Sequence, residues 1–195
     1  RFLGKITVGV YPMNNINNVR VNTGIAYLKE TFRSRPNLTV IGNAHTDKIL
    51  FEGTKAVGVR LINGEEYKGK EIILSAGSYG SPAILQRSGI GVQSHLEELD
   101  IPVLVDAPVG EKLYDHPIFY NAYAVDPEES GEQTPAIAAV VWTKTSFAKK
   151  EELDIHITGT HLFPHEQSPT GRGFVLAVAL TNPTSKGVFK ITSMD

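Results

Sequence analysis

The residues best suited to chemistry lie in the stretch Lys70–Gly91, around Ser75-Ala76-Gly77 and Ser81-Pro82. Small residues and a glycine let the backbone turn sharply and leave the main chain bare, so a flat ligand can approach it closely. Serine followed by proline is typical of a helix start, where free N–H groups and a partial positive charge favour a phosphate or a reduced, anionic ring. Packing alone explains this pattern equally well, since a fold does not fix a function.

The residues on either side predict a strand, a tight turn and a helix. Ile72–Leu74 form a short unbroken apolar run, typical of a strand buried on both faces. Ala83–Leu85 start a helix that we expect to end at Ser88-Gly89, because glycine suits the left-handed position after a helix. The glycine corner would then lie at the carboxyl end of a strand, where open α/β sheets bind their ligands.

The predicted elements change in character at about Pro117. Before it, we expect a helix from Asn22 that ends at Pro36, and a β-meander with a hairpin at Asn63-Gly64. After it, strands follow one another without helices and predict an antiparallel sheet. The predicted strands span residues 39–41, 46–51, 56–62 and 67–74 in the meander, and 118–125, 135–143, 153–160, 174–180 and 187–192 in the second sheet. We therefore expect an α+β fold: an α/β portion with a meander, then a mainly antiparallel sheet.

The histidines suggest two further hypotheses. Neutral imidazoles are common metal ligands, and three of them lie near one acidic residue: His156, His161, His165 and Glu166. Their spacing matches no zinc motif, and we expect no metal. Asp115-His116 precedes Pro117, and we expect a buried hydrogen-bonded pair with a structural rather than a catalytic role.

Composition and motifs exclude several classes of protein. The 195 residues carry a net charge of −2, which gives no electrostatic case for binding nucleic acid or an anionic membrane. The absence of cysteine excludes disulfides, a thiol nucleophile and a zinc-thiolate site. No apolar run is long enough to span a bilayer, no signal peptide opens the chain, and neither a nucleophile elbow nor a GxxxxGK loop is present. The compartment stays open, and we expect the chain to be part of a longer protein.

The stretch Gly77–Gly91 resembles the second signature of the glucose–methanol–choline (GMC) family of flavoprotein oxidoreductases. The residues that carry the resemblance are Gly77-Ser78, Ser81-Pro82, Ile84-Leu85 and Ser88-Gly89-Ile90-Gly91. Other segments resemble the same family in the same order: Ala26-Tyr27-Leu28, Arg35-Pro36-Asn37-Leu38, Ile101-Pro102-Val103 and Asp115-His116-Pro117.

The resemblance implies an FAD cofactor and the oxidation of an alcohol CH–OH to a carbonyl, with hydride transfer to the flavin. It implies cofactor-binding residues at Thr46, Ala76, Gly77, Ser81, Pro82 and Gly110. Thr46 stands where the family usually has valine, whose main chain contacts the adenine. The G-x-G-x-x-G fingerprint and the family's catalytic histidine are both missing from this chain, so no catalytic residue is expected in it.

By the same resemblance, residues 1–116 correspond to part of the FAD-binding domain, with the meander and the second signature, and residues 117–195 to part of the substrate-binding domain. The implied partners are a small-molecule alcohol and the remainder of the same polypeptide; the electron acceptor is not indicated. Two alternatives stay open: a non-redox hydroxynitrile lyase on the same scaffold, and an inactive structural fragment without cofactor.

Overall fold

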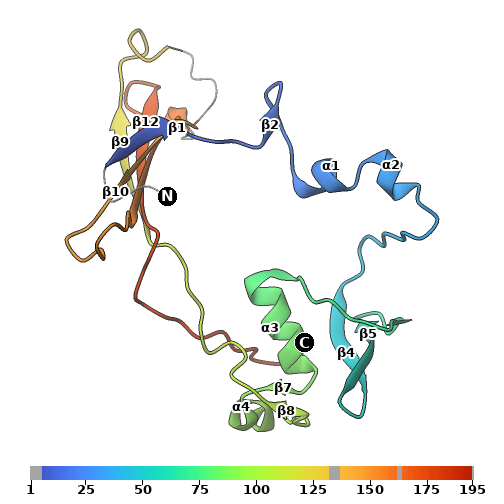
Figure 1. The fold of residues 1–195 in the computed structure, drawn as a ribbon. Helices are drawn as coiled ribbons and strands as arrows, with labels where there is room; N and C mark the ends of the chain where they lie inside the picture. Colours follow the sequence, from blue (N-terminus) through green and yellow to red (C-terminus); the bar gives the residue numbers. More distant parts are fainter. Residues whose placement is uncertain (1–5, 132–136, 162–163, 195) are drawn as a thin grey trace. The chain divides into compact units, whose positions relative to one another are not determined.

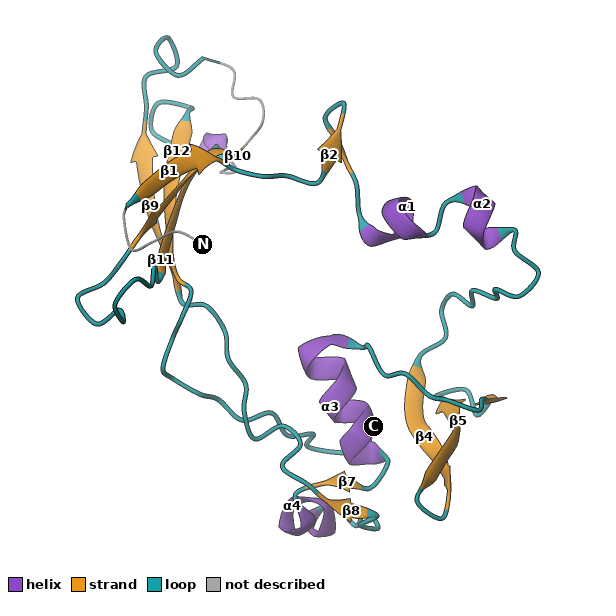
Figure 2. Ribbon diagram, viewed as in Figure 1, coloured by secondary structure: helices purple, strands orange, loops and turns teal. Residues whose placement is uncertain are grey.

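A computed structural model describes residues 6–131, 137–161 and 164–194 of the chain (Figure 1). The chain forms two compact units. One contains the residues up to 38 together with 115–184, and the other contains residues 39–114 and 185–195. Helices and strands are mixed along the chain (Figure 2), and the predicted α+β class is confirmed.

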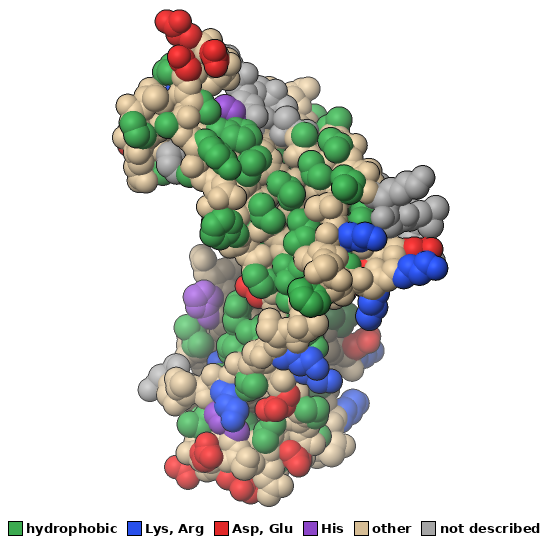
Figure 3. Space-filling view, turned by 90° about the vertical axis from the view of Figure 1, so that its left-hand side faces the viewer, with side chains coloured by type: hydrophobic (Ala, Val, Ile, Leu, Met, Phe, Trp, Pro, Cys, Tyr) green, Lys and Arg blue, Asp and Glu red, His purple; other side chains and the backbone are tan. Residues whose placement is uncertain are grey.

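The first unit is built on a five-stranded antiparallel sheet in the order β1-β10-β11-β12-β9. Its strands are β1 (Thr7–Val10), β9 (Ile118–Ala124), β10 (Ile137–Thr143), β11 (Ile155–Thr160) and β12 (Gly173–Leu180). The antiparallel sheet expected after Pro117 is confirmed, and β1, from the start of the chain, forms one edge of it because Thr7 pairs with Trp142. Apolar side chains remain exposed on this sheet, as the space-filling view shows (Figure 3); Phe119 and Tyr120 are 66% and 63% exposed.

The rest of the first unit consists of short elements: β2 (Asn15–Ile16), β3 (Val19–Arg20), α1 (Thr23–Tyr27), α2 (Glu30–Arg33) and the 3₁₀ helix η1 (His165–Gln167). Asn22 caps α1 by accepting a hydrogen bond from the N–H of Ile25, at 2.9 Å. The single long helix predicted from Asn22 is wrong, because the chain leaves helical geometry at Leu28. Neither helix buries a residue, so packing does not extend them.

The second unit contains a three-stranded meander in the order β4-β5-β6 and the helix α3. Its elements are β4 (Thr46–Glu52), β5 (Lys55–Leu61), β6 (Glu66–Lys68), α3 (Gly77–Arg87), the parallel pair β7 (Ile90–Gly91) and β8 (Val105–Asp106), and α4 (Gln93–Glu98). The meander and its Asn63-Gly64 turn are confirmed. Residues 39–41 form no strand, and residues 187–192 contribute only a single bridge, between Gly187 and Leu113.

The predicted buried strand at Ile72–Leu74 is wrong. These residues have no strand assignment, and Ile73 is 81% exposed. A strand buried on both faces needs hydrogen-bonded neighbours on each side, and no strand of the described residues pairs with this segment. The apolar run is therefore present without the sheet that would bury it.

A small apolar core holds α3 in the second unit. Leu96 of α4 is fully buried and packs with Ile101 and Ile191. Ala83 of α3 and Phe189 pack against this cluster. Burial of this kind contributes about 25 cal/mol per Å² of apolar surface. The end of the chain is therefore part of the packing that fixes α3.

Candidate functional site

The N-terminal end of α3 forms an open corner. Gly77 has a φ of +81°, which favours glycine, and a Cβ built on it would meet no atom within 4 Å. Ala76 and Gly77 are both exposed. The first N–H groups of a helix have no acceptor within it, so those of Gly77 and Ser78 can donate to an anionic ligand. The corner thus leaves bare main chain open to a ligand.

Ser81 and Pro82 lie inside α3, and the helix start predicted at Ser81 is wrong. The helix begins at Gly77, after Ala76 as N-cap. The Ser81 hydroxyl accepts a hydrogen bond from the N–H of Ala76, at 3.0 Å, and so fixes the turn that leads into the helix. Pro82 has no N–H and leaves the carbonyl of Ser78 without its usual partner in the helix.

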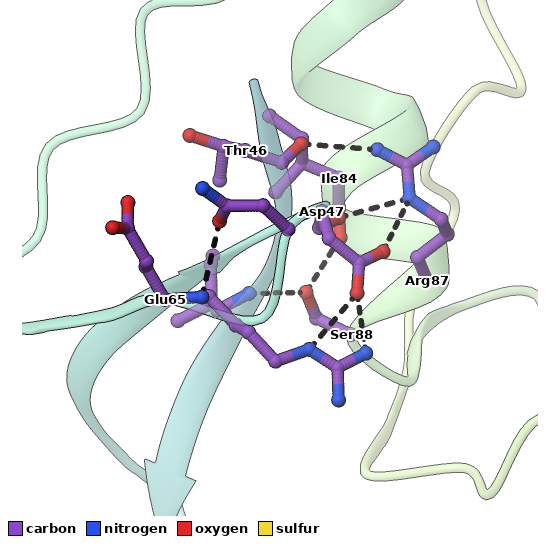
Figure 4. Close-up of polar contacts among 9 residues, drawn as sticks. Thr46, Asp47, Glu65, Ile84, Arg87 and Ser88 are labelled. Carbon is purple, nitrogen blue, oxygen red and sulfur yellow. Dashed lines mark hydrogen bonds and ion pairs between the residues drawn. The ribbon is translucent and has the colours of Figure 1, made fainter. Parts of the chain in front are cut away.

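Arg87 and Ser88 attach the other end of α3 to β4 (Figure 4). Arg87 Nε donates to the carbonyl oxygen of Asp47 at 2.9 Å and lies 3.3 Å from Asp47 Oδ1. The guanidinium of Arg60 pairs with the other carboxylate oxygen of Asp47. Ser88 Oγ accepts from the N–H of Ile49 at 2.9 Å. The Asp47 and Arg87 side chains are only 14% and 20% exposed, so water screens their ion pair weakly, whereas the Arg60 side chain is 38% exposed.

Thr46 lies on the same side of α3 as the corner. Its carbonyl oxygen accepts a hydrogen bond from Arg87 Nη2 at 3.4 Å. Ser88 contacts β4. Gly77 lies eleven residues before Ser88 and Ser81 lies seven before it, and both spacings place a residue on the same face of a helix as Ser88. At 1.5 Å per residue, Gly77 lies about 15 Å along the helix from Arg87. A ligand that contacts both Gly77 and the backbone at Arg87 would therefore be extended.

Gly110 lies in a turn that packs against the last segment of the chain. Its φ is +84°, and a Cβ built on it would lie 2.1 Å from the carbonyl oxygen of Phe189. The N–H of Phe189 donates to the carbonyl of Gly110 at 2.8 Å. This close approach explains the glycine without a ligand. A contact between Gly110 and a cofactor stays a prediction.

The histidines pack as ordinary side chains. Within the described residues, no group of three or more His, Asp or Glu side chains is placed to hold a metal ion. His165 Nδ1 accepts a hydrogen bond from the N–H of Gly173 at 3.1 Å. His161 packs edge-on against Phe174, and burial lowers its pKa, with smaller contributions from His165 and Arg172.

Asp115 and His116 do not form the buried pair that the sequence predicts. Both residues are exposed. Their hydrogen bond joins the backbone N–H of His116 to Asp115 Oδ1, at 2.8 Å, and leaves the imidazole outside it. The bond is local, since a short acidic side chain readily bonds nearby backbone.

A family model described as GMC oxidoreductase matches residues 2–118. The chain belongs to this family. Two similar relatives carry the name "Oxygen-dependent choline dehydrogenase". The protein of Pseudomonas fluorescens strain Pf-5 is 48% identical over 112 residues, which cover 54% of this chain and 20% of the relative. That of Pectobacterium carotovorum is 48% identical over 110 residues, with the same coverage. The chain thus spans about a fifth of the length of these relatives.

Solved structures show the same fold for this GMC chain. Pyridoxine 4-oxidase from Mesorbium loti superposes with a TM-score of 0.74 at 23% identity, covering 96% of this chain and 39% of that one. A formate oxidase gives a TM-score of 0.69 at 20% identity, covering 84% of this chain and 39% of the oxidase. No helix in the described part of the chain has the length and apolar character to cross a membrane.

The residues that hold the site together are those that the sequence patterns miss. Asp47, Arg60 and Arg87 come from three elements and meet only in the fold. The one available signal was local: Gln86-Arg87 places two polar residues in a helix whose neighbours Ile84 and Leu85 are apolar. Polar residues next to apolar ones are ordinary on an amphipathic helix, so this signal does not identify the contact.

Proposed function

We propose that this chain is part of an FAD-dependent oxidoreductase that oxidises an alcohol CH–OH to a carbonyl. The observation that carries the proposal is the open glycine corner at the start of α3, in a chain of the GMC oxidoreductase family. The relatives named "Oxygen-dependent choline dehydrogenase" support a small amino alcohol such as choline as the substrate.

The residues at the corner fit an extended dinucleotide. The exposed main chain of Ala76 and Gly77 leaves room for a flat or anionic group, and no atom of the described residues lies within 4 Å of a Cβ built on Gly77. Thr46, whose carbonyl accepts from the Arg87 side chain, would contact another part of the ligand through its main chain. Ser81 would support the site by holding the turn, through the hydrogen bond that its hydroxyl accepts from the N–H of Ala76.

The chemistry divides between the cofactor and the protein. A bound FAD supplies the acceptor for the hydride that leaves the carbinol carbon. The residues of this chain would bind and orient the cofactor. The start of α3 offers N–H groups, and the Asp47–Arg87 contact holds α3 against β4. We assign no catalytic residue to the described part of the chain.

We further propose that residues 1–116 contribute mainly to the cofactor-binding domain and residues 117–195 to the substrate-binding domain of the enzyme. The sheet of β9–β12 would then serve the substrate side, and β1 would join it as an edge strand from the first segment. The remaining parts of the enzyme would come from the rest of the same polypeptide, because the relatives are about five times as long as the matched region.

The test is an absorption spectrum of the purified enzyme that contains this chain, followed by anaerobic addition of choline. We expect the two visible bands of oxidised flavin, and their bleaching on addition of the alcohol. A yellow protein that no primary alcohol bleaches would support a lyase on this scaffold instead. A folded, colourless protein that takes up no added FAD would refute the proposal.

A further inference from the structure

Gln86 is a buried polar residue whose side-chain hydrogen bonds all go to backbone groups distant in the sequence. It is 1% exposed. Its Nε2 donates to the carbonyl of Val109 at 3.1 Å and to that of Phe189 at 3.2 Å. Its Oε1 accepts from the N–H of Ile191 at 3.0 Å. The side-chain amide thus uses both donors and one acceptor site on segments far from it in the sequence.

These three bonds bring together pieces of the candidate site. Gly110 directly follows Val109, and a Cβ on Gly110 would lie 2.9 Å from Gln86 Nε2. The ring of Phe189 packs against Tyr79, with 5.8 Å between the centroids. Tyr79 is the third residue of α3, next to the corner, and remains 59% exposed. One amide therefore links the Gly110 turn, the Phe189 segment and, through Tyr79, the open end of α3.

We propose that Gln86 is a positioning residue of the cofactor site: it holds the Gly110 turn and the Phe189 segment against α3, so that the corner and Gly110 keep the geometry that the dinucleotide requires. The inference rests on the proposed function. Gln86 acts through its neighbours, because its own side chain is buried and has no surface for a ligand.

The chemistry of the amide makes the role specific. An apolar residue of similar size, such as methionine, would fill the space but leave two carbonyl groups and one N–H without partners. A buried backbone group without a hydrogen-bond partner costs free energy, so the backbone shifts toward other partners or water. The Gly110 turn would move, because it has no side chain to hold it and packs directly on the Phe189 carbonyl.

The experiment compares Gln86→Met with the wild-type enzyme loaded with FAD. We expect a Kd for FAD at least about tenfold higher, the factor that 1.4 kcal/mol represents, and an altered visible circular dichroism of the bound flavin. Gly110→Ala should change the Kd and the circular dichroism in the same direction. The loss of binding free energy in the double variant should be smaller than the sum of the two single losses, because both substitutions act on one contact. Phe189→Leu keeps the backbone bonds and an apolar side chain against the Leu96 cluster, and it removes the ring contact with Tyr79; we expect the Kd for FAD to change about threefold.

Thr145→Val is the matched control, since it also removes a partly buried hydrogen bond, at 2.7 Å to Asp154, but in the other unit. It should lower the urea midpoint without changing the Kd or the flavin spectrum. Folded Gln86→Met or Phe189→Leu enzyme with the wild-type Kd and circular dichroism would overturn the inference. A wild-type enzyme that binds no FAD would refute the proposed function first, and the inference with it.

Discussion

The attachment of α3 to β4 gives the most direct structural prediction. Arg87→Met removes the hydrogen bond from Nε to the Asp47 carbonyl, at 2.9 Å, and the ion pair to Asp47 Oδ1, at 3.3 Å. The Arg87 side chain is 20% exposed, so water replaces these contacts only in part. A hydrogen bond to a charged group contributes about 1.5–3 kcal/mol. Asp47 keeps Arg60 as a partner, so we expect a loss of about 2 kcal/mol, toward the lower end of that range.

Hydrogen exchange of the Ile49 amide measures this loss locally, because its N–H donates to Ser88 Oγ at the same junction. A loss of about 2 kcal/mol makes exchange about 30-fold faster. Lys55→Met, at an exposed position of β5, should leave it unchanged. If the Ile49 amide exchanges at the wild-type rate in Arg87→Met, or at the same rate in both variants, the reasoning is wrong.

Two further predictions concern pH in the first unit. The hydrogen bond from Thr145 lowers the pKa of Asp154, against the opposing effect of burial. The ionised Asp154 carboxylate therefore stabilises the fold at pH values above the pKa of an unfolded carboxyl group, and this stabilisation is lost as pH falls through the folded-state pKa. In urea unfolding, Thr145→Val should lower the free energy of unfolding by about 2 kcal/mol at neutral pH and by less in acid. Burial, and to a smaller extent His116, lowers the pKa of His156, so stability should fall as pH drops below the ordinary value of 6.5. An NMR titration should give His156 a midpoint below 6.5, and a midpoint above it would contradict the burial between Tyr11 and Trp142.

Local signals predicted those parts of the fold that depend on neighbouring residues. The Asn63-Gly64 turn sets the β5–β6 hairpin because both elements meet through it. Asn22 starts a helix because its own side chain caps it. Alternation in β11 indicates a half-buried strand, and the structure confirms one.

Signals that depend on distant partners failed. Ile72–Leu74 have the composition of a buried strand, but no described strand lies beside them to complete its hydrogen bonds. A local signal failed too: Ser81-Pro82 resembles a helix start, yet α3 begins four residues earlier, where Gly77 allows the turn. Gly110 is glycine because the Phe189 carbonyl lies against it, a contact with a residue 79 positions later that no local pattern indicates.

We propose that the main chain at Gly77 receives the dinucleotide, and a pair of glycine substitutions tests this contact. Gly77→Ala adds a Cβ to an open position with φ +81°, and Gly64→Ala does the same in a hairpin turn at φ +87°, also in open space. Both should lose about 1 kcal/mol of stability from the left-handed backbone. Fluorescence titration with FAD should show the Kd raised at least about tenfold for Gly77→Ala and unchanged for Gly64→Ala. Equal affinity of the two folded variants for FAD would contradict the account.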